Sequence, residues 1–502
     1  MIGAFPKPMS TPLISISALS SRIHGCWLGK SIGGTLGLPA EGKMDRLHYT
    51  FYDPVPTIAP PNDDLELQLV WLHLLETLKD GTLTQRHFAD AWLNHLHYMW
   101  DEYGRCRWNL RRGVPIAAVG TFENNFVSGM GSPIRSEIWA CLFPGDPASA
   151  AYYAALDASL DHGVEGIAGE VLFSVMQSLV AAGMPAAQAI NEALDRIPAG
   201  CETACALALV RTAFKNNAPA WEARDQLLAK HGNDNFTHTP LNAGLTIWAL
   251  LYGEGDFEKS ILLAVNGGYD TDCTAATVGA TIGLAIGAEA IPDRWRQPIG
   301  EGVFVGEGIV GINAAASLGE LTNRTIALVG KLKAKDWSDL DWSPAIPAVD
   351  LATLPGTISL QPIDGSAPVL FANGELPAAV KAAGGAQWDW TPANPGKAHF
   401  IVALARSGAK LFADGQLVLN CSAGEPYVPA THRPAKSSRA SFTPSAGPHR
   451  MRVELGSSDA SQDATVLLAY ANLHICPWTG EELPNHAVLM TSPQSLSSGL
   501  AD

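Results

Sequence analysis

Charged residues are scarce in this chain of 502 residues, at 16%, and acidic side chains outnumber basic ones, so the formal net charge is −16. Nucleic-acid backbones are bound by clustered Lys and Arg. The charge balance therefore argues against DNA or RNA as a partner. No apolar run reaches the roughly 18 residues of a membrane-spanning helix. Residues 1–21 lack a basic start followed by a long apolar stretch, so we expect neither a signal peptide nor a membrane segment.

Cysteine is also sparse. The eight cysteines follow neither a metal-site nor a disulfide-type spacing. Cys201 and Cys205 lie one helical turn apart and fit a packed helix face better than a bridge. Reduced thiols and a cytoplasmic location are therefore expected.

The pattern of the chain changes near residue 337, and a chain of this length favours two domains. Before it, apolar residues recur at helical spacing, for example in residues 65–78. Residues 337–357 are rich in Pro, Asp and Ser without a helical period, which predicts a linker. Short alternating runs then predict strands, and Asp414-Gly415 between two of them predicts a hairpin turn. We predict a mainly α N-terminal domain (1–336) and a C-terminal antiparallel β-sandwich (358–502) with a structural or homo-oligomer-forming role.

Two acidic turns are the main chemical signals. Asp270 and Asp272 follow a pair of glycines and precede a small, glycine-studded apolar run, and Asp63 and Asp64 also precede an apolar helical run. An Asp at a helix start is usually only an N-cap. Two such turns facing each other would instead offer the several oxygens that hard cations require. The second turn favours the metal interpretation, with one or two Mg²⁺ or Mn²⁺ ions.

Three segments, in order, resemble the ADP-ribosylglycohydrolase family. Asn-Asp-Asp at 62–64 is similar to the family's Thr-Asp-Asp, and Asp-Thr-Asp-Cys at 270–273 to its Asp-x-Asp-Thr. Residues 29–41, which end in Glu41, resemble its opening Gly-rich helix and turn. The resemblance covers roughly the first two-thirds of the chain. It implies a helical catalytic domain that hydrolyses a glycosidic bond at an anomeric ribose carbon, with two ions gripping the sugar diol.

The same resemblance implies site residues. The metal ligands would be Asn62, Asp63, Asp64, Asp270, Asp272 and Cys273. The catalytic carboxylates would be Glu41, Asp63 and Asp64. The substrate contacts would be Gly131, Arg135, His162, Gly268 and Tyr269. From the residues alone, a solvated loop residue is the favoured interpretation of Glu41, and His162 is equally a structural hydrogen-bonding group.

The chain departs from the family pattern around the expected metal centre. Gly34 stands where many members carry Asp, and Asn62, Leu65 and Cys273 each replace a threonine. A thiol at position 273 either points away from the ions or shifts their preference toward Mn²⁺ or Zn²⁺. The substrate therefore stays open among ADP-ribosylated protein, nucleoside, nucleotide sugar and other glycosides.

Two other functions remain open. One is a metal-independent glycoside hydrolase in which Glu41 and Glu165 act as acid and base. The other is a catalytically inactive protein that binds ADP-ribose or a glycan. Metal content and turnover distinguish the three.

Overall fold

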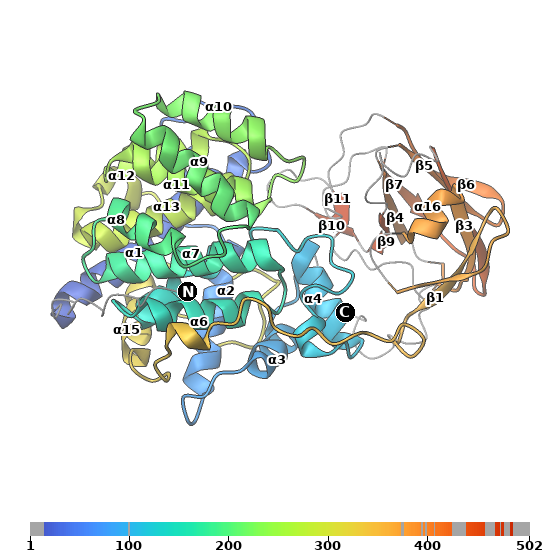
Figure 1. Cartoon of the computed structure of the whole chain (residues 1–502), viewed down its shortest axis with the longest axis horizontal. Helices are drawn as coiled ribbons and strands as arrows, with labels where there is room; N and C mark the ends of the chain where they lie inside the picture. Colours follow the sequence, from blue (N-terminus) through green and yellow to red (C-terminus); the bar gives the residue numbers. More distant parts are fainter. Residues whose placement is uncertain are drawn as a thin grey trace. The chain divides into compact units, whose positions relative to one another are not determined.

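The computed structural model describes residues 15–98, 101–372, 376–392, 395–396, 399–405, 407–423, 438–456, 467–471, 473–475 and 482–484 (Figure 1). The chain forms two compact units. The first contains residues up to 95 together with 128–159 and 163–344, and the second contains 96–127, 160–162 and the chain from 345 onward.

The first unit is helical, as the sequence predicts. Its longer helices are α1 (Ile16–Gly37), α2 (Asp63–Thr77), α3 (Gln85–His95), α5 (Glu137–Leu142), α6 (Pro147–Ala158), α7 (Val164–Ala181), α8 (Ala186–Leu194), α9 (Glu202–Lys215), α10 (Ala220–His231), α11 (Thr239–Gly253), α12 (Phe257–Asn266), α13 (Thr271–Ile286), α14 (Asp293–Arg296) and α15 (Leu318–Leu328). Short 3₁₀ turns follow α1 (Leu38–Ala40) and precede α5 (Pro133–Arg135). The apolar period of residues 65–78 is realised in α2, whose side chains from Leu67 to Leu72 are buried.

Among the described helices, α7 alone is long and apolar enough to cross a bilayer by length and composition, and 78% of it is buried within the fold. The core helix of a packed domain has both properties. Packing therefore accounts for the apolar character of α7, and the expectation of no membrane segment stays a prediction.

Helices α1 and α13 lie antiparallel with their backbones in contact. The contact repeats every fourth residue and pairs Gly25, Gly29, Gly33 and Gly37 with Gly283, Gly279, Ala275 and Thr271. A Cβ on any of these four α1 glycines would come within 2.0–2.3 Å of a carbonyl oxygen of α13, so only glycine fits. This packing brings the C-terminal end of α1 to the N-terminal end of α13.

The second unit contains α4 (Asp101–Arg111), α16 (Ala378–Ala382) and the C-terminal sheets. A six-stranded antiparallel sheet has the order β2-β1-β3-β8-β5-β6. Its strands are β1 (Ile358–Pro362), β2 (Val369–Phe371), β3 (Gly385–Trp390), β5 (Ala409–Ala413), β6 (Gln416–Cys421) and β8 (His449–Leu455). A second sheet has the order β7-β4-β9, formed by Arg439–Phe442, His399–Leu404 and Leu467–Ala471. β10 (Leu473–Ile475) pairs with β11 (Glu482–Pro484).

The core of this unit confirms the predicted antiparallel β architecture. Trp388, Leu411 and Val453 of the large sheet form one buried cluster, and Phe442 of β7 packs against it. The predicted hairpin turn is also confirmed. Asp414 and Gly415 join β5 to β6 with φ of 49° and 81°, the left-handed values that a tight two-residue hairpin requires.

Candidate metal centre

Three chain segments meet at one buried point of the helical unit. α13 begins there with Thr271, whose hydroxyl donates to the Gly37 carbonyl at the end of α1 over 2.8 Å. α2 begins there with Asn62 as N-cap, and its side-chain oxygen accepts from the Asp64 amide at 2.8 Å. An N-terminal helix end carries a partial positive charge, which favours the carboxylates placed in these first turns.

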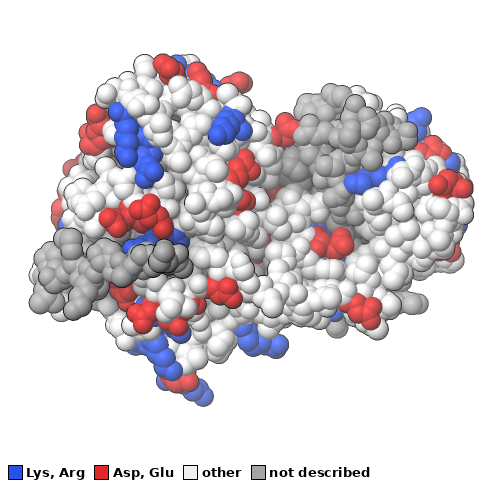
Figure 2. Space-filling model, viewed as in Figure 1, with Lys and Arg blue, Asp and Glu red and all other residues white. Residues whose placement is uncertain are grey.

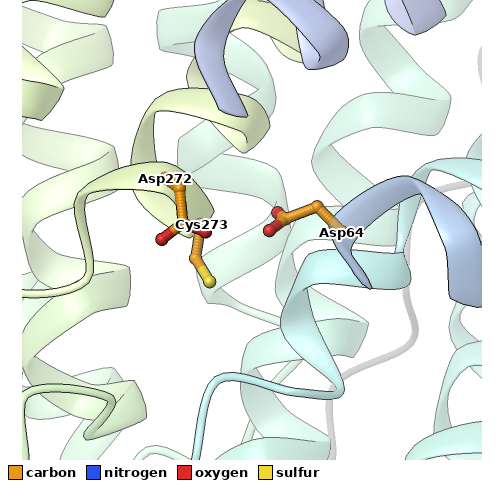
Figure 3. Close-up of side chains that lie close together, drawn as sticks. All are labelled: Asp64, Asp272 and Cys273. Atoms are coloured by element: carbon orange, nitrogen blue, oxygen red, sulfur yellow. The ribbon is translucent and has the colours of Figure 1, made fainter. Parts of the chain in front are cut away.

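Carboxylates from these segments form two groups with metal-ligand spacing. One group consists of Asp64, Asp272 and Cys273, and the other of Glu41, Asp270 and Asp272. Within each group, one potential metal-ligand atom from each residue lies within 4.8 Å of those from the other two. Asp272 belongs to both groups. Figure 3 shows Asp64 reaching from the start of α2 toward Asp272 and Cys273 at the start of α13. The two acidic turns therefore face each other, as the metal interpretation requires.

Three carboxylates of these groups are buried, and too few hydrogen-bond donors surround them. Asp64, Asp270 and Asp272 are 1%, 1% and 3% exposed. Asp64 Oδ2, both oxygens of Asp270 and Asp272 Oδ1 accept no hydrogen bond within the described part of the chain. An unpaired buried carboxylate is costly, because the charge loses its hydration without compensation. Something from outside the chain is needed to satisfy these oxygens.

The pKa values follow from that burial. Burial, followed by the nearby Glu41 carboxylate, raises the pKa of Asp270 and of Asp272 well above the ordinary range. Burial raises the pKa of Asp64 to about 7, although the Lys30 ammonium partly opposes it. Burial and the surrounding carboxylates also raise the pKa of the Cys273 thiol. A bound cation would reverse this local field, because it favours the deprotonated form of every ligand.

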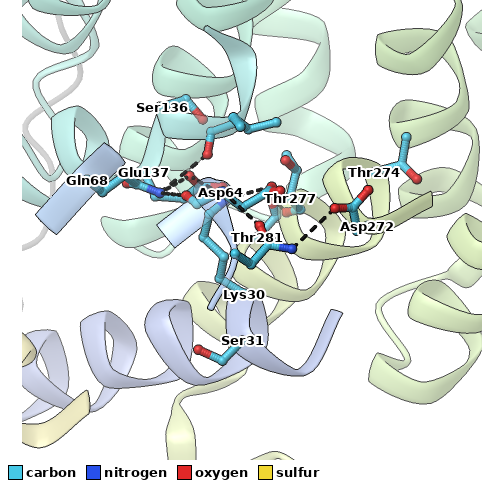
Figure 4. Close-up of polar contacts among 12 residues, drawn as sticks. Lys30, Ser31, Asp64, Gln68, Ser136, Glu137, Asp272, Thr274, Thr277 and Thr281 are labelled. Atoms are coloured by element: carbon cyan, nitrogen blue, oxygen red, sulfur yellow. Dashed lines mark hydrogen bonds and ion pairs between the residues drawn. The ribbon is translucent and has the colours of Figure 1, made fainter. Parts of the chain in front are cut away.

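Lys30 holds Asp64 in place through an ion pair. Its Nζ lies 3.4 Å from Asp64 Oδ1 and 3.1 Å from Glu137 Oε2, and the ammonium is fully buried. Gln68 donates to Glu137 Oε2 at 2.9 Å, and Gln177 donates to Glu137 Oε1 at 3.2 Å (Figure 4). Each group in this network restricts the next, so Asp64 is held with Oδ2 available.

Asn62 and Gly34 are a matched pair. The Asn62 Nδ2 donates to Asp272 Oδ2 at 3.2 Å, so this residue links the two acidic turns. A Cβ on Gly34 would approach that same nitrogen to 3.3 Å. Gly34 thus leaves the space that the Asn62 amide occupies. The two departures from the family pattern therefore lie next to each other in the structure.

The turn that carries Glu41 is attached to the turn before α13. The Gly42 amide donates to the Tyr269 carbonyl at 2.9 Å, and the Tyr269 amide donates to the Lys43 carbonyl at 2.8 Å. Gly268 has φ of +76°, and a Cβ there would meet the Asp45 carbonyl at 2.4 Å. Gly268 and Tyr269 therefore support the position of Glu41 through the backbone. Their predicted role in substrate binding stays a prediction.

The helical region is similar to proteins of one known family. A family model described as ADP-ribosylglycohydrolase matches residues 15–328, which is more than half of the chain. The chain belongs to the ADP-ribosylglycohydrolase family. An uncharacterized protein of Archaeoglobus fulgidus is 24% identical over 324 residues, which span 62% of this chain and 100% of that relative. A solved structure described as an ADP-ribosylglycohydrolase-related protein complex is 20% identical and covers 62% of this chain and 99% of its own, with a TM-score of 0.42.

Two residues matched to the family pattern lie in a separate polar group of the helical unit. Arg135 is fully buried, and its Nε donates to Asp157 Oδ1 at 3.0 Å while another of its nitrogens donates to the Gly131 carbonyl at 2.9 Å. Trp139 donates to Asp157 Oδ2 at 3.2 Å. These contacts give Arg135 and Gly131 a structural function, and substrate contact by them stays a prediction.

His162 belongs to the second unit. Its Nδ1 lies 2.9 Å from Asp161 Oδ1 and its Nε2 lies 3.6 Å from Glu102 Oε1, and the ring is fully buried. Burial opposes the charged form, but the two carboxylates outweigh it and raise the pKa of His162 to about 9. The two carboxylates are therefore ion-pair neighbours of His162, while neither ring nitrogen forms a hydrogen bond with a described residue. A substrate role for His162 stays a prediction.

Lys30 and Glu137 are site residues that the sequence did not reveal. In the sequence, Lys30 is one residue of the predicted Gly-rich helix and Glu137 stands at the end of a polar loop, so neither is distinguished from its neighbours. A lysine among glycines and apolar residues, on the helix that ends in Glu41, is the one signal that could have found Lys30. Nothing in the sequence connects Glu137 to Asp64, because they lie on different helices.

The donor set fits a divalent cation. Hard ions such as Mg²⁺ and Mn²⁺ take several oxygens, and this family centre offers buried carboxylates whose oxygens have no other partner. Asp64, Asp270 and Asp272 would be the main ligands, with Glu41 at the half-buried edge. Asp63, the half-buried first residue of α2, lies beside them.

Proposed function

We propose that this protein is a divalent-metal-dependent hydrolase of a glycosidic bond, acting on an ADP-ribosyl, nucleoside or related ribosyl substrate. The observation that carries the proposal is the pair of ligand groups that share Asp272, with buried carboxylate oxygens that have no partner in the described chain. Family membership supports the reaction class. A shared carboxylate between two groups favours two ions over one.

Bound divalent ions would supply Lewis acidity, neutralise the carboxylates and orient the sugar hydroxyls. The side chains of the chain then have separate tasks. Asp64, Asp270 and Asp272 hold their oxygens in place, and Lys30 and Asn62 keep two of them oriented. The negative surroundings favour positive charge developing on the sugar ring.

Glu41 is the carboxylate that we assign to proton transfer. It is half-buried, lies at the edge of the cluster and is held by the backbone contacts of residues 42–43 with Tyr269. A general base must reach the water whose proton it accepts, so a position at the open edge suits this role. Asp63 occupies the corresponding edge at the start of α2 and is the second candidate.

Glu165 argues against the metal-independent alternative. Both of its carboxylate oxygens accept from the start of α9, at 2.9 Å from the Glu202 amide and 2.8 Å from the Thr203 amide. This carboxylate caps a helix, and a catalytic acid would have to leave that bond. The metal-dependent hydrolase is therefore favoured over the Glu41–Glu165 pair.

A small-molecule or ADP-ribosylated or glycosylated substrate is the partner expected for this site. On the face drawn in Figure 2, Lys and Arg lie in small groups interleaved with Asp and Glu. That arrangement is consistent with the expected absence of a nucleic-acid partner. The cytoplasmic location and a homo-oligomer formed by the C-terminal sheets remain predictions from the sequence.

The test is a substrate panel assayed with Mg²⁺, with Mn²⁺ and with excess chelator. The panel contains an ADP-ribosylated protein, a free nucleoside and a nucleotide sugar, and release of the leaving group is measured. We expect turnover of at least one substrate class only when the metal is present. Full activity in excess chelator, or binding of every substrate without turnover, would refute the proposal.

A further inference from the structure

We propose that the two ion positions differ in chemistry, because Cys273 supplies a sulfur ligand to one of them. The position among Asp64, Asp272 and Cys273 would take a thiophilic divalent ion such as Zn²⁺ or Co²⁺. The position among Glu41, Asp270 and Asp272 contains oxygen donors only and would take Mg²⁺ or Mn²⁺. This inference rests on the proposed metal centre and adds which ion each position selects.

Cys273 lies where a ligand would be. A sulfur, a carboxylate oxygen of Asp64 and one of Asp272 all lie within 4.8 Å of one another. Asp64 Oδ2 and Asp272 Oδ1 are buried oxygens that accept no hydrogen bond from the described residues. The thiol therefore lies beside two carboxylates that each have one oxygen without a partner among the described residues.

The close contact between α1 and α13 does not account for the position of Cys273. α13 contacts α1 through residues 271, 275, 279 and 283, which follow one another every fourth residue along one face. Each residue turns about 100° around a helix, so position 273 lies roughly 200° away from position 271. The side chain consequently leaves the α1–α13 seam, and its sulfur lies within 4.8 Å of a carboxylate oxygen of Asp64 on α2.

The second ion position, which contains only oxygen ligands, differs from the position beside Cys273. Asp270 and Asp272 come from the same turn as Cys273, and Glu41 comes from the turn after α1. Soft thiolate ligands select Zn²⁺ and similar ions, whereas all-oxygen sites suit Mg²⁺. Asp272 bridges both groups, so the two ions would share one carboxylate. The chain can therefore distinguish two ions that sit side by side.

The experiment titrates the full chain, first stripped of metal, with Co²⁺ and records the near-ultraviolet sulfur-to-cobalt charge-transfer band. Three proteins are compared: wild type, Cys273→Ser and Cys205→Ser. Cys205 is exposed on α9 and serves as the matched control for loss of a thiol. We expect the band in wild type and Cys205→Ser and its loss in Cys273→Ser. Competition titrations should show the preference for Zn²⁺ over Mg²⁺ falling roughly 10-fold or more in Cys273→Ser.

The readout does not depend on turnover, so the two proposals fail separately. Co²⁺ binding without the band in wild type, or a band that persists in Cys273→Ser, would overturn the sulfur ligand and leave the hydrolase proposal intact. A Cys273-dependent band in a protein that cleaves nothing in the substrate panel would support the sulfur ligand and refute the hydrolase.

Discussion

Two buried charged groups in the helical unit invite comparison. In the group around Arg135, both oxygens of Asp157 accept hydrogen bonds, one from the guanidinium and one from the Trp139 indole. In the acidic cluster, both oxygens of Asp270 and one oxygen each of Asp64 and Asp272 accept none within the described chain. Asp157, Asp64, Asp270 and Asp272 are all almost completely buried. Burial therefore does not distinguish Asp157 from Asp270, whereas the supply of hydrogen-bond donors does.

This difference distinguishes a structural role from a functional one. A buried carboxylate that the protein itself neutralises contributes to the stability of the fold, because removing its partner leaves an unpaired charge. A buried carboxylate that the protein leaves unsatisfied requires a partner from outside. The same chain thus contains one buried carboxylate that its own side chains satisfy and one acidic group that could hold a cation.

The largest effect is expected from Asp272→Asn, because Asp272 belongs to both ligand groups. Divalent-metal affinity should fall roughly 100-fold or more, and activity with it. Since the substitution removes an unsatisfied buried charge, metal-free stability should stay the same or rise. Elemental analysis and thermal unfolding without metal measure both. Unchanged metal content would contradict the assignment.

Arg135→Met sharpens the comparison from the other side. It leaves Asp157 buried without its cation, and breaking a buried pair typically costs about 3–5 kcal/mol in the free energy of unfolding. Metal affinity should hardly change. Denaturant unfolding and metal titration of the same protein check this. A stable variant with an increased KM would instead assign Arg135 to substrate binding.

Gly33→Ala tests whether the acidic cluster depends on the α1–α13 contact. A methyl group at Gly33 would lie 2.0 Å from the Ala275 carbonyl oxygen, so the helices must separate. We expect a loss of about 3–4 kcal/mol in stability, together with weaker metal binding. Gly200→Ala is the control, because nothing lies within 4 Å of a Cβ built there. Equal stabilities for the two variants would show that the contact is dispensable.

His162 extends the comparison to the second unit, where Asp161 and Glu102 flank a buried imidazolium. The pKa of His162 is raised from 6.5 to about 9, so the charged ring stabilises the fold fully below 6.5 and loses this contribution as pH rises through about 9. The shift corresponds to a contribution on the order of 3 kcal/mol.

The stability difference between wild type and His162→Gln, measured by denaturant unfolding, should therefore shrink between neutral pH and pH values above 9. A difference that stays constant across this range would show that the ring is neutral in the folded protein. Measuring both proteins at each pH removes the contributions of the other titrating groups.

The sequence alone indicated the helical region, the C-terminal strands and the two acidic turns. The apolar run of residues 65–78 predicts α2, which is buried along most of its length. Asp414-Gly415 predicts its hairpin because few residues adopt two successive positive φ values. The acidic turns were recognisable for a similar reason, since their chemistry is confined to a few neighbouring residues. Structural features that depend only on residues adjacent in the chain can be recognised in a sequence.

Only the tertiary structure decided which carboxylates lack a partner. Asp157 and Asp272 are both acidic residues in helical segments, and nothing adjacent to them in sequence indicates that Arg135 and Trp139 satisfy one while the other is left open. Lys30 and Asp64 are 34 residues apart, and Asn62 and Asp272 are 210 apart. Contacts over such separations depend on which helix faces meet, and here the glycine seam of α1 and α13 sets that, because it lets two backbones approach as no other residue would allow.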